Sequence, residues 1–316
     1  MSDLKLVATR EAYGKTLVEL GRENPNVVVL DADLSASTKT SDFGKEFPER
    51  FFDMGIAEQD MISTAAGLAA CGKTVFASTF AVFGSGRAWD QVRMSVAYTR
   101  LNVKIVVTHG GITTGEDGAS HQANEDIAIM RVLPNMTVIV PADAVETANV
   151  IRAAAKFYGP MYIRLGRPKT PVIFGQQDYG FKIGKGVVMR KGKDLTIFAC
   201  GLMVSKALEA ADELSKKGVD CRVVNLHTIK PIDKHLIIKC AEETGAVVTA
   251  EEHSILGGLG GAVAEVLVEN ACVPMARVGV KDMFGESGKP DELLVKYGLT
   301  PHHIAAAVKS VIKRKK

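Results

Sequence analysis

The chain lacks the cysteine patterns of disulfide-stapled and zinc-binding proteins. Its 316 residues include five cysteines, and no two of them form a Cys-x-x-Cys pair. An odd number of widely spaced cysteines argues against a disulfide framework and against a cysteine-bound zinc ion. We therefore predict buried, free thiols and a reducing compartment.

The chain also lacks a long apolar run and a strong net charge. No stretch reaches the roughly 20 residues of a membrane-spanning helix, and residues 1–5 contain no apolar core of signal-peptide length. The net charge of +3 is too small to indicate a nucleic-acid partner, and the basic run 313–316 is typical of a solvated helix end. We expect a soluble, cytoplasmic protein with no nucleic-acid or membrane partner.

The chain does contain an alternation of short β-branched runs and helical segments. This alternation predicts parallel sheets covered by helices, and the length favours two domains. We place one domain at residues 1–167, a linker with a strand pair at 168–193, and a second domain at 194–316. Strands are expected at 27–30, 74–80, 103–108, 137–140, 161–164, 195–199, 221–226, 246–250 and 276–280. The main helices are expected at 10–23, 60–71, 89–98, 145–157 and 204–217.

Glu58 is an isolated acid at the point where an apolar, strand-like run turns into a helix. Met61, Ala65 and Leu68 recur behind it at helical spacing, so Glu58 falls near the helix start. A carboxyl group there is either a helix cap, worth about 0.3–1 kcal/mol, or a working group. By position alone a cap is the more common case.

Polar and aromatic side chains follow the ends of several predicted strands of the first domain. Open α/β sheets bind ligands at the carboxyl ends of their strands, so these loops should meet at one edge. The loop 108–122 is long and glycine-rich, and long loops inside compact domains are usually functional. The loops present Asp33, Ser37, Phe80, Phe83, His109, Asp117, His121, Arg164 and Arg167.

Each of these features has an ordinary structural alternative. Phenylalanines are more often core than ligand contacts, and a lone histidine such as His109 is more often a hydrogen-bonded structural residue. The turn 115–118 resembles a calcium-type turn, but no further acids follow at ligand spacing. The glycine cluster 257–261 resembles a dinucleotide fingerprint, and we predict a tight turn into a helix there. Only the conjunction of the loops favours a functional site.

In combination these segments resemble the pyrimidine-binding domain of transketolases. Residues 228–233 and 251–254 are similar to the C-terminal domain of that family, so the resemblance covers almost the whole chain in order. It implies two doubly wound α/β domains, the first with a parallel sheet and the second with a mixed sheet. The segments that carry the first match are Arg50–Gly67, Ser78–Phe83, Thr108–Gln122, Arg131–Met136 and Ile163–Pro168.

The resemblance implies that thiamine diphosphate is the cofactor. Glu58 matches the acid that hydrogen-bonds the far ring nitrogen of the pyrimidine, which allows the cofactor's own imino group to deprotonate the thiazolium. Sharing a proton with a weakly basic nitrogen favours a dry pocket. Phe80 and Phe83 match the aromatic residues that enclose the pyrimidine, and Asp33 matches an acid near the thiazolium.

The resemblance also implies a binding site for a sugar phosphate. Guanidinium groups bind phosphate oxygens two at a time, and the phosphate residues of the family are matched by Arg10, Ser37 and Arg167. The residues that hold substrate hydroxyls, and that in the case of the histidines assist proton transfer, are matched by His109, Asp117 and His121. We expect Arg164 to be a structural neighbour and assign no chemistry to His253.

One part of the family pattern has no match in this chain. Transketolases have an earlier domain in which a Gly-Asp-Gly segment and a later Asn hold magnesium and the diphosphate through oxygen ligands. We therefore expect no metal ligands here and expect an N-terminal transketolase subunit to bind Mg²⁺ or Ca²⁺. By family analogy two copies of each chain form a heterotetramer with sites between subunits.

The implied function is ketol transfer from a ketose phosphate, such as xylulose 5-phosphate, to an aldose phosphate. A 1-deoxyxylulose 5-phosphate synthase is one alternative, but it usually has an acid followed by arginine in place of His109. The β subunit of a 2-oxoacid dehydrogenase is another, but its substrates carry no phosphate for Arg10 and Arg167. A non-catalytic partner subunit is the third, and the acid at Glu58 weighs against it. The preferred sugar pair cannot be assigned, because the absent domain helps to shape the pocket.

Overall fold

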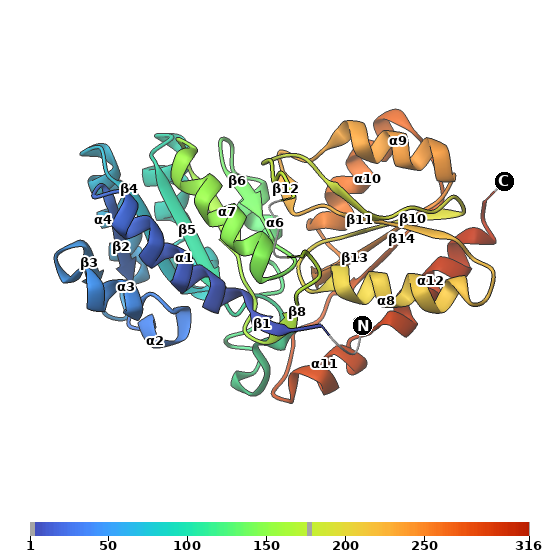
Figure 1. The fold of residues 1–316 in the computed structure, drawn as a ribbon, viewed down its shortest axis with the longest axis horizontal. Coiled ribbons are helices and arrows are strands. Elements are labelled where there is room, and N and C mark those ends of the chain that lie inside the picture. The colour runs from blue at the N-terminus through green and yellow to red at the C-terminus, as the bar shows by residue number, and fades with distance from the viewer. Residues whose placement is uncertain (1–3, 176–178, 316) are drawn as a thin grey trace.

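The computed structural model describes residues 4–175 and 179–315 and shows two α/β parts that lie side by side (Figure 1). We call the part around the seven-stranded sheet the N-terminal unit and the part around the five-stranded sheet the C-terminal unit. The first sheet has the order β12 (Thr228–Lys230), β6 (Thr137–Ile139), β7 (Met161–Arg164), β5 (Val103–Thr108), β4 (Thr74–Phe80), β2 (Val27–Asp31) and β3 (Phe51–Asp53). The second has the order β14 (Met275–Val280), β13 (Val247–Ser254), β10 (Leu195–Ala199), β11 (Cys221–Asn225) and β9 (Val187–Arg190).

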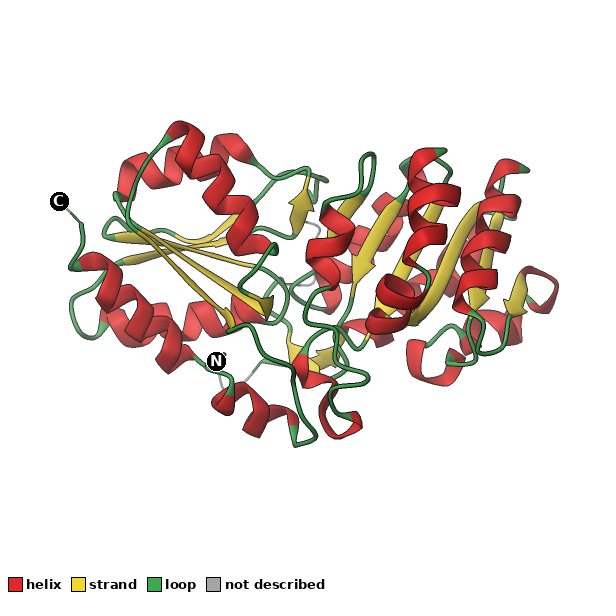
Figure 2. Cartoon of the chain, turned by 180° about the vertical axis from the view of Figure 1, so that it is seen from behind, coloured by secondary structure: helices red, strands yellow, loops and turns green. Residues whose placement is uncertain are grey.

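Both sheets are parallel except at one edge. In the first sheet only β12 runs antiparallel to its neighbour β6, and in the second only β9 runs antiparallel to β11. Helices cover both faces of each sheet (Figure 2). The predicted fold class, two doubly wound α/β domains, is therefore confirmed, with an antiparallel edge strand in the first sheet that the prediction did not include.

Alternate residues of the strands point into two separate apolar layers. In β2, Val27 and Val29 pack with Leu17 of α1 (Thr9–Glu23), whereas Leu30 packs with Met61 of α4 (Glu58–Ala70). A strand that is buried on both faces needs apolar residues at successive positions, which explains its continuous apolar run. The remaining helices of this unit are α2 (Ser35–Thr38), α3 (Ser41–Glu46), α5 (Trp89–Gln91), α6 (Asp126–Arg131) and α7 (Ala144–Lys156).

The two units are joined by strands as well as by apolar packing. The sequence of β12 belongs to the C-terminal half of the chain, yet it completes the first sheet beside β6. One apolar cluster also contains residues of both halves, Val140 and Leu226 among them. The C-terminal unit carries α8 (Met203–Ser215), α9 (Lys234–Thr244), α10 (Leu259–Asn270), α11 (Pro290–Lys296) and α12 (Pro301–Ile312).

The structure corrects the predicted strand pair between residues 168 and 193. Strands do occur there, but β8 (Lys169–Pro171) pairs with β1 (Leu6–Ala8), and β9 pairs with β11. Residues 176–178 of this segment lie outside the described residues. The predicted helix at 89–98 is also corrected, because α5 continues as the π-helical segment η3 (Val92–Tyr98).

The structure also bears on two of the expected absences. All five cysteines are free, but Cys71 and Cys272 are exposed rather than buried. Within residues 4–175 and 179–315, none of the helices combines the length and the apolar character that crossing a membrane requires.

Candidate active site

Glu58 is a buried acid at the first position of α4. The chain reaches it from β3 through Gly55, whose φ of 69° lies in the left-handed region that suits glycine. The Glu58 side chain is 1% exposed, and its Oε2 accepts a 2.8 Å hydrogen bond from Nη1 of Arg87. Within the described part of the chain the Glu58 carboxylate accepts no hydrogen bond from a backbone N–H of α4, so Glu58 does not cap the helix. A buried carboxylate that gives up its cationic partner needs another hydrogen-bond donor in its place.

Arg87 was missed by the sequence analysis. It ends the π-helical segment η2 (Phe83–Arg87), and π-helical turns often occur at functional sites. Its Cζ lies 4.6 Å from the centroid of the Phe83 ring. The guanidinium therefore contacts a carboxylate at its edge and an aromatic ring at its face. The sequence signal that could have identified Arg87 as a site residue is its position four residues after Phe83.

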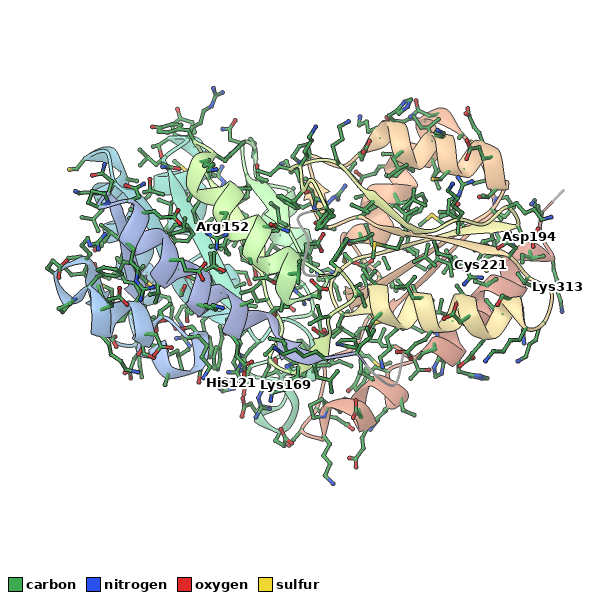
Figure 3. The ribbon with its side chains drawn as sticks, viewed as in Figure 1. His121, Arg152, Lys169, Asp194, Cys221 and Lys313 are labelled. Atoms are coloured by element: carbon green, nitrogen blue, oxygen red, sulfur yellow. The ribbon has the colours of Figure 1, made fainter. Side chains whose placement is uncertain are left out.

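Two phenylalanines and two histidines of the predicted site form one aromatic cluster. Phe80 ends β4, and its ring lies 6.1 Å from that of Phe83 with an angle of 13° between the planes. The His109 ring stacks on Phe80 at 3.8 Å, and the His121 ring meets Phe83 edge-on at 5.2 Å. In the orientation of Figure 1, His121 lies on the lower edge of the N-terminal unit (Figure 3). The structure thus brings these four predicted residues together.

His109 follows β5 and is held in an uncommon backbone conformation. Its φ is 60°, and its carbonyl oxygen accepts a 2.7 Å hydrogen bond from the hydroxyl of Thr114. Its Nδ1 lies 2.8 Å from the hydroxyl of Thr108. Burial, followed by the nearby charges of Arg10 and Arg167, lowers the pKa of His109 to about 3. The ring is therefore neutral near pH 7, and it can orient a substrate hydroxyl without carrying a charge.

Arg10 and Arg167 form a cationic pair beside His109. Nη1 of Arg10 donates to the carbonyl oxygen of Ser37 at 2.9 Å, whereas its buried Nε has no partner among the described residues. Burial and the neighbouring Arg167 lower the pKa of Arg10. Arg167 donates from Nη1 to the carbonyl of Thr114 and, at 2.8 Å, to Oε2 of Glu116. Two cations with an unused N–H suit an oxyanion, so these residues fit the phosphate that the resemblance implied.

Three other predicted residues lie at this edge without fixed side-chain partners. Ser37 contributes its carbonyl oxygen to the bond with Arg10, and no hydrogen bond of its hydroxyl is found within the described residues. Asp33 and Asp117 are exposed, and the parts of the chain described here offer no partner to either carboxylate. Asp33 has a φ of 58°, and its backbone N–H donates to Oδ1 of Asp53. These three remain candidates by location.

Asp31 is a second buried acid of this unit, and it was not among the predicted site residues. It ends β2, accepts 2.6 and 2.7 Å hydrogen bonds from the hydroxyls of Thr38 and Thr40, and accepts a third bond from the backbone N–H of Leu34. Burial raises its pKa to about 6, although these donors oppose the shift. Asp31 therefore ties the loop that carries Asp33 and Ser37 to the end of its strand.

Arg164 and His253 make structural contacts. Nε of Arg164 donates to Oδ2 of Asp126 at 2.7 Å, and Nη2 donates to the carbonyl of Ala123. Nδ1 of His253 lies 2.7 Å from the carbonyl of Ser254. Both residues are buried, Arg164 as the expected structural neighbour and His253 with no chemistry assigned to it.

The residues around Glu58 fit the pyrimidine end of thiamine diphosphate. A buried carboxyl beside the Phe80 and Phe83 rings suits a planar pyrimidine that offers a ring nitrogen. In the part of the chain that the structure describes, no three histidine, cysteine, aspartate or glutamate side chains cluster as metal ligands. The arrangement can accommodate a planar pyrimidine beside Glu58 and an anion beside Arg10 and Arg167.

Comparison with known proteins identifies matches along nearly the whole chain. Residues 5–172 match the family model "Transketolase, pyrimidine binding domain", and residues 184–304 match "Transketolase, C-terminal domain". A putative transketolase C-terminal section of Methanocaldococcus jannaschii is 54% identical over 96% of both chains. A 6-deoxy-6-sulfo-D-fructose transketolase subunit of Clostridium sp. is 45% identical over 97% of this chain and 95% of the relative. A solved split gene transketolase, an inactive beta4 tetramer, is 58% identical and has a TM-score of 0.92, covering 98% of this chain and all of the other.

Proposed function

The chain belongs to the transketolase family as a subunit of the split type, and from this premise we propose its reaction. It transfers a two-carbon ketol unit from a ketose phosphate of the xylulose 5-phosphate type to an aldose phosphate. It does so as the C-terminal subunit of an enzyme whose other chain is an N-terminal transketolase subunit.

One observation carries the proposal: the aromatic cluster connects a buried acid to a pair of cations. At one end Glu58 accepts a hydrogen bond from Arg87, and the Arg87 guanidinium lies against the Phe83 ring. At the other end His109 stacks on Phe80, and burial together with the charges of Arg10 and Arg167 lowers the pKa of His109. A cofactor ring and a phosphorylated sugar can therefore be held next to each other.

Each residue then has a role that its surroundings support. Glu58 would share a proton with the pyrimidine nitrogen, once Arg87 has left its carboxylate. Phe80 and Phe83 would exclude water from that contact, and Arg167 would hold the remote phosphate. Thiamine diphosphate, when bound, would supply the nucleophilic carbon chemistry that the protein side chains lack.

The remaining assignments complete the substrate site. Neutral His109 donates or accepts a hydrogen bond at the reacting end of the sugar, and His121, whose ring meets the Phe83 ring edge-on, assists it. The other residues are placed by the family match and by their position at this edge, namely Arg10 and Ser37 at the phosphate, Asp117 at the sugar hydroxyls, and Asp33 near the thiazolium.

The partner subunit supplies what this chain does not provide. Mg²⁺ or Ca²⁺ and the diphosphate are bound by the N-terminal chain, and two copies of each chain form a heterotetramer. The isolated chain should accordingly bind thiamine diphosphate weakly and should not transfer ketol groups.

A sulfonate is an alternative to the phosphate as the anion that Arg10 and Arg167 bind. One relative is a 6-deoxy-6-sulfo-D-fructose transketolase subunit, and a guanidinium pair can bind a sulfonate as well as a phosphate. A ketose with a terminal sulfonate is therefore the second candidate substrate of this chain.

Reconstitution with the N-terminal chain tests the proposal. We expect no ketol transfer from this chain alone, and transfer from xylulose 5-phosphate to ribose 5-phosphate when the partner, thiamine diphosphate and Mg²⁺ are added. Comparable activity without the partner would refute the split assembly. A rate with a sulfonated ketose that exceeds the rate with every ketose phosphate would instead support the second candidate.

A further inference from the structure

The loop that follows β5 draws much of its support from the C-terminal unit. This loop, residues 109–122, carries His109, Asp117 and His121 and includes the segment η4 (Ile112–Asp117). We call it the substrate loop. It lies at the junction of the units, where α11 packs against η4.

Glu252 of β13 is the most deeply buried of these supports. Its side chain accepts a 2.8 Å hydrogen bond at Oε1 from the backbone N–H of Thr113, which lies in the loop 139 residues earlier. The approach is so close that a Cβ added to Gly111 would lie 2.3 Å from Oε1 of Glu252. Glycine at position 111, with a φ of 85°, therefore allows the carboxylate to reach the loop backbone.

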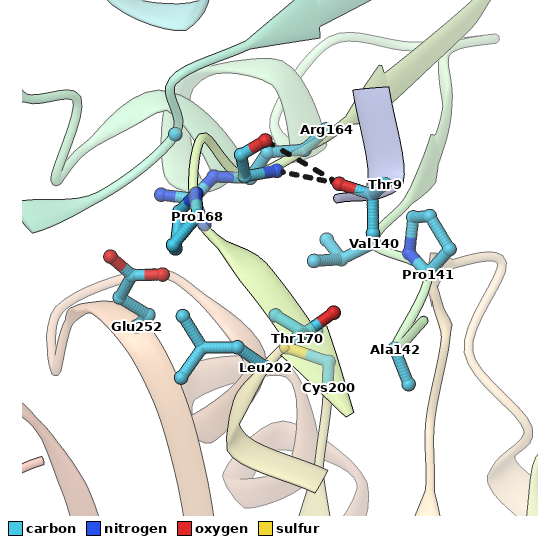
Figure 4. Close-up of a pocket in the computed structure, with 13 residues that line it drawn as sticks. Thr9, Val140, Pro141, Ala142, Arg164, Pro168, Thr170, Cys200, Leu202 and Glu252 are labelled. Carbon is cyan, nitrogen blue, oxygen red and sulfur yellow. Dashed lines mark hydrogen bonds between the residues drawn. The ribbon is translucent and has the colours of Figure 1, made fainter. Parts of the chain in front are cut away.

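Glu252 also faces a cation across the junction. It lines a cavity of about 20 Å³ together with Arg164, and the two side chains come from opposite units (Figure 4). A cavity of this size holds about one water molecule. Burial raises the pKa of Glu252 to about 7, although the Arg164 charge opposes the shift by favouring the ionised form.

Two further contacts join the substrate loop to the C-terminal unit. Nε2 of Gln122, the last residue of the loop, donates to the carbonyl oxygen of Glu286 at 2.9 Å. The hydroxyl of Ser287 donates to the carbonyl oxygen of Glu116, near the centre of the loop, at 2.7 Å. The loop is therefore held at Thr113, at Glu116 and at Gln122.

The contact at Thr113 leads to the substrate residues within one step along the chain. The hydroxyl of the next residue, Thr114, holds the carbonyl oxygen of His109, and its own carbonyl accepts from Arg167. A displacement of Thr113 would therefore move His109 and Arg167 together.

We propose that the C-terminal unit serves catalysis by positioning the substrate loop, with Glu252 as the central positioning residue. Glu252 does not touch the substrate. It fixes the backbone at Thr113, and through Thr114 it sets the places of His109 and Arg167. The role in catalysis rests on the proposed function, whereas the ordering of the loop does not.

Hydrogen–deuterium exchange of the full chain tests the ordering by itself. Glu252→Ala removes the acceptor and should increase exchange in peptides from residues 109–122, with roughly tenfold faster exchange at Thr113. Glu252→Gln keeps an acceptor oxygen and should restore most of the protection. Glu265→Gln is the matched control, because it removes another contact between the units, the ion pair with Arg131, outside the loop. Ser287→Ala, at an exposed position, gives a second reading if Glu252→Ala does not fold.

Kinetics of the assembled enzyme test the consequence. A displacement of about 1 Å can cost on the order of 100-fold in rate, so Glu252→Ala should lower kcat/KM for the ketose phosphate roughly 10- to 100-fold. The KM for thiamine diphosphate should stay the same, because within the described residues neither Glu58 nor Arg87 has a hydrogen bond or ion pair with Glu252. Glu252→Gln should recover most of kcat/KM, and Glu265→Gln should change neither constant.

Three results would overturn the proposal. The first is unchanged hydrogen exchange of the loop in both Glu252→Ala and Ser287→Ala. The second is a loss of loop protection or of kcat/KM in Glu265→Gln that equals the loss in Glu252→Ala. The third is a rise of the thiamine diphosphate KM in Glu252→Ala that parallels the fall of kcat/KM, which would mean general damage to the fold. If the wild-type assembly transfers no ketol unit from any sugar, the proposed function fails, and the exchange data alone decide whether Glu252 orders the loop.

Discussion

The two sides of the candidate site draw their contacts from different distances along the chain. Glu58 meets Arg87 at a separation of 29 residues, and both belong to the N-terminal unit. Thr113 meets Glu252 at a separation of 139 residues, and Gln122 meets Glu286 at 164. The acid side of the site is therefore built within one unit, whereas the substrate loop depends on how two units meet.

This difference has a thermodynamic consequence. Glu58 starts a helix that packs on a central strand, so its position is fixed by the cohesion of the N-terminal core. The substrate loop is held by a few hydrogen bonds across a junction, and segments held in this way open at a lower free energy than a core does. The comparison predicts separate effects on catalysis, on stability and on cofactor binding when each side is changed.

The largest effect is expected from removing the acid. Glu58→Ala should lower kcat of the assembled enzyme by roughly 10³-fold, because the proton shared with the cofactor is lost. Assembly should be unaffected, as measured by analytical ultracentrifugation. Asp60→Ala is the matched control, because Asp60 is an exposed acid in the same first turn of α4. Unimpaired turnover in Glu58→Ala would refute the catalytic role proposed for Glu58.

The next effect is a pH dependence of stability that comes from Glu252 on the loop side. The pKa of Glu252 is raised to about 7 in the folded state from its ordinary value of 4.5, so the folded protein binds the proton more tightly than the unfolded one. Stability from this group is present below pH 4.5 and is lost as the pH rises through 7. The shift corresponds to a contribution on the order of 3 kcal/mol.

Glu252→Gln should abolish this dependence. Its free energy of unfolding relative to wild type should therefore rise between pH 5 and pH 8, as measured by urea denaturation at each pH. Other shifted groups, such as Glu146 and Asp31, are common to both proteins and cancel in the difference. Glu265→Gln, which changes an exposed acid, should show no such trend, and the same trend in both variants would contradict the assignment.

A smaller effect is expected from changing Arg167 of the cationic pair. Arg167→Ala should raise KM for a phosphorylated ketose roughly 10- to 100-fold, because a charged hydrogen bond to a remote group is worth about 1.5–3 kcal/mol. KM for an unphosphorylated ketose should change much less. Arg152→Ala, which removes a surface ion pair with Glu19, is the control. Equal losses for both ketoses would mean that Arg167 supports the loop and does not hold the phosphate.

The smallest effect is expected at Arg87. Its guanidinium engages both Glu58 and the Phe83 ring, which are the partners proposed for the pyrimidine, so it has to move when the cofactor binds. Arg87 is 46% exposed, so its ion pair is screened and worth about 1 kcal/mol at most. Arg87→Ala should therefore tighten thiamine diphosphate binding to the isolated chain by up to about fivefold, measured by calorimetry. Arg93→Ala, at an exposed arginine nearby, should leave the affinity unchanged, and weaker binding by Arg87→Ala would mean that Arg87 assists the cofactor.

The sequence predicted the elements best where local patterns were strongest. The strands at 74–80, 103–108, 161–164 and 195–199 have the predicted bounds, because their apolar runs end at clear breaks. The pairing of the strands near residues 170 and 188 was predicted wrongly, because each adds to the edge of a different sheet. Edge pairing depends on which neighbour is close in space, and local composition carries no record of that.

The candidate site shows the same division. The loops that follow parallel strands had to meet at one sheet edge, so the grouping of Phe80, Phe83 and His109 could be predicted. Arg87 was missed because a π-helical turn, rather than a regular helix, brings it to Glu58. Glu252 was missed as a contact of the loop because its partner is a backbone N–H, which every residue but proline has.

The fold class, the strand ends at which the candidate site lies and the acid at position 58 could all be predicted from the sequence. The reason is physical: apolar periodicity fixes secondary structure, and parallel strands bring their carboxyl ends together. The pairing of Arg87 with Glu58 and the hydrogen bond from the substrate loop to Glu252 became evident from the folded structure alone. Those contacts depend on side-chain directions and on the docking of two units, and no local pattern encodes either.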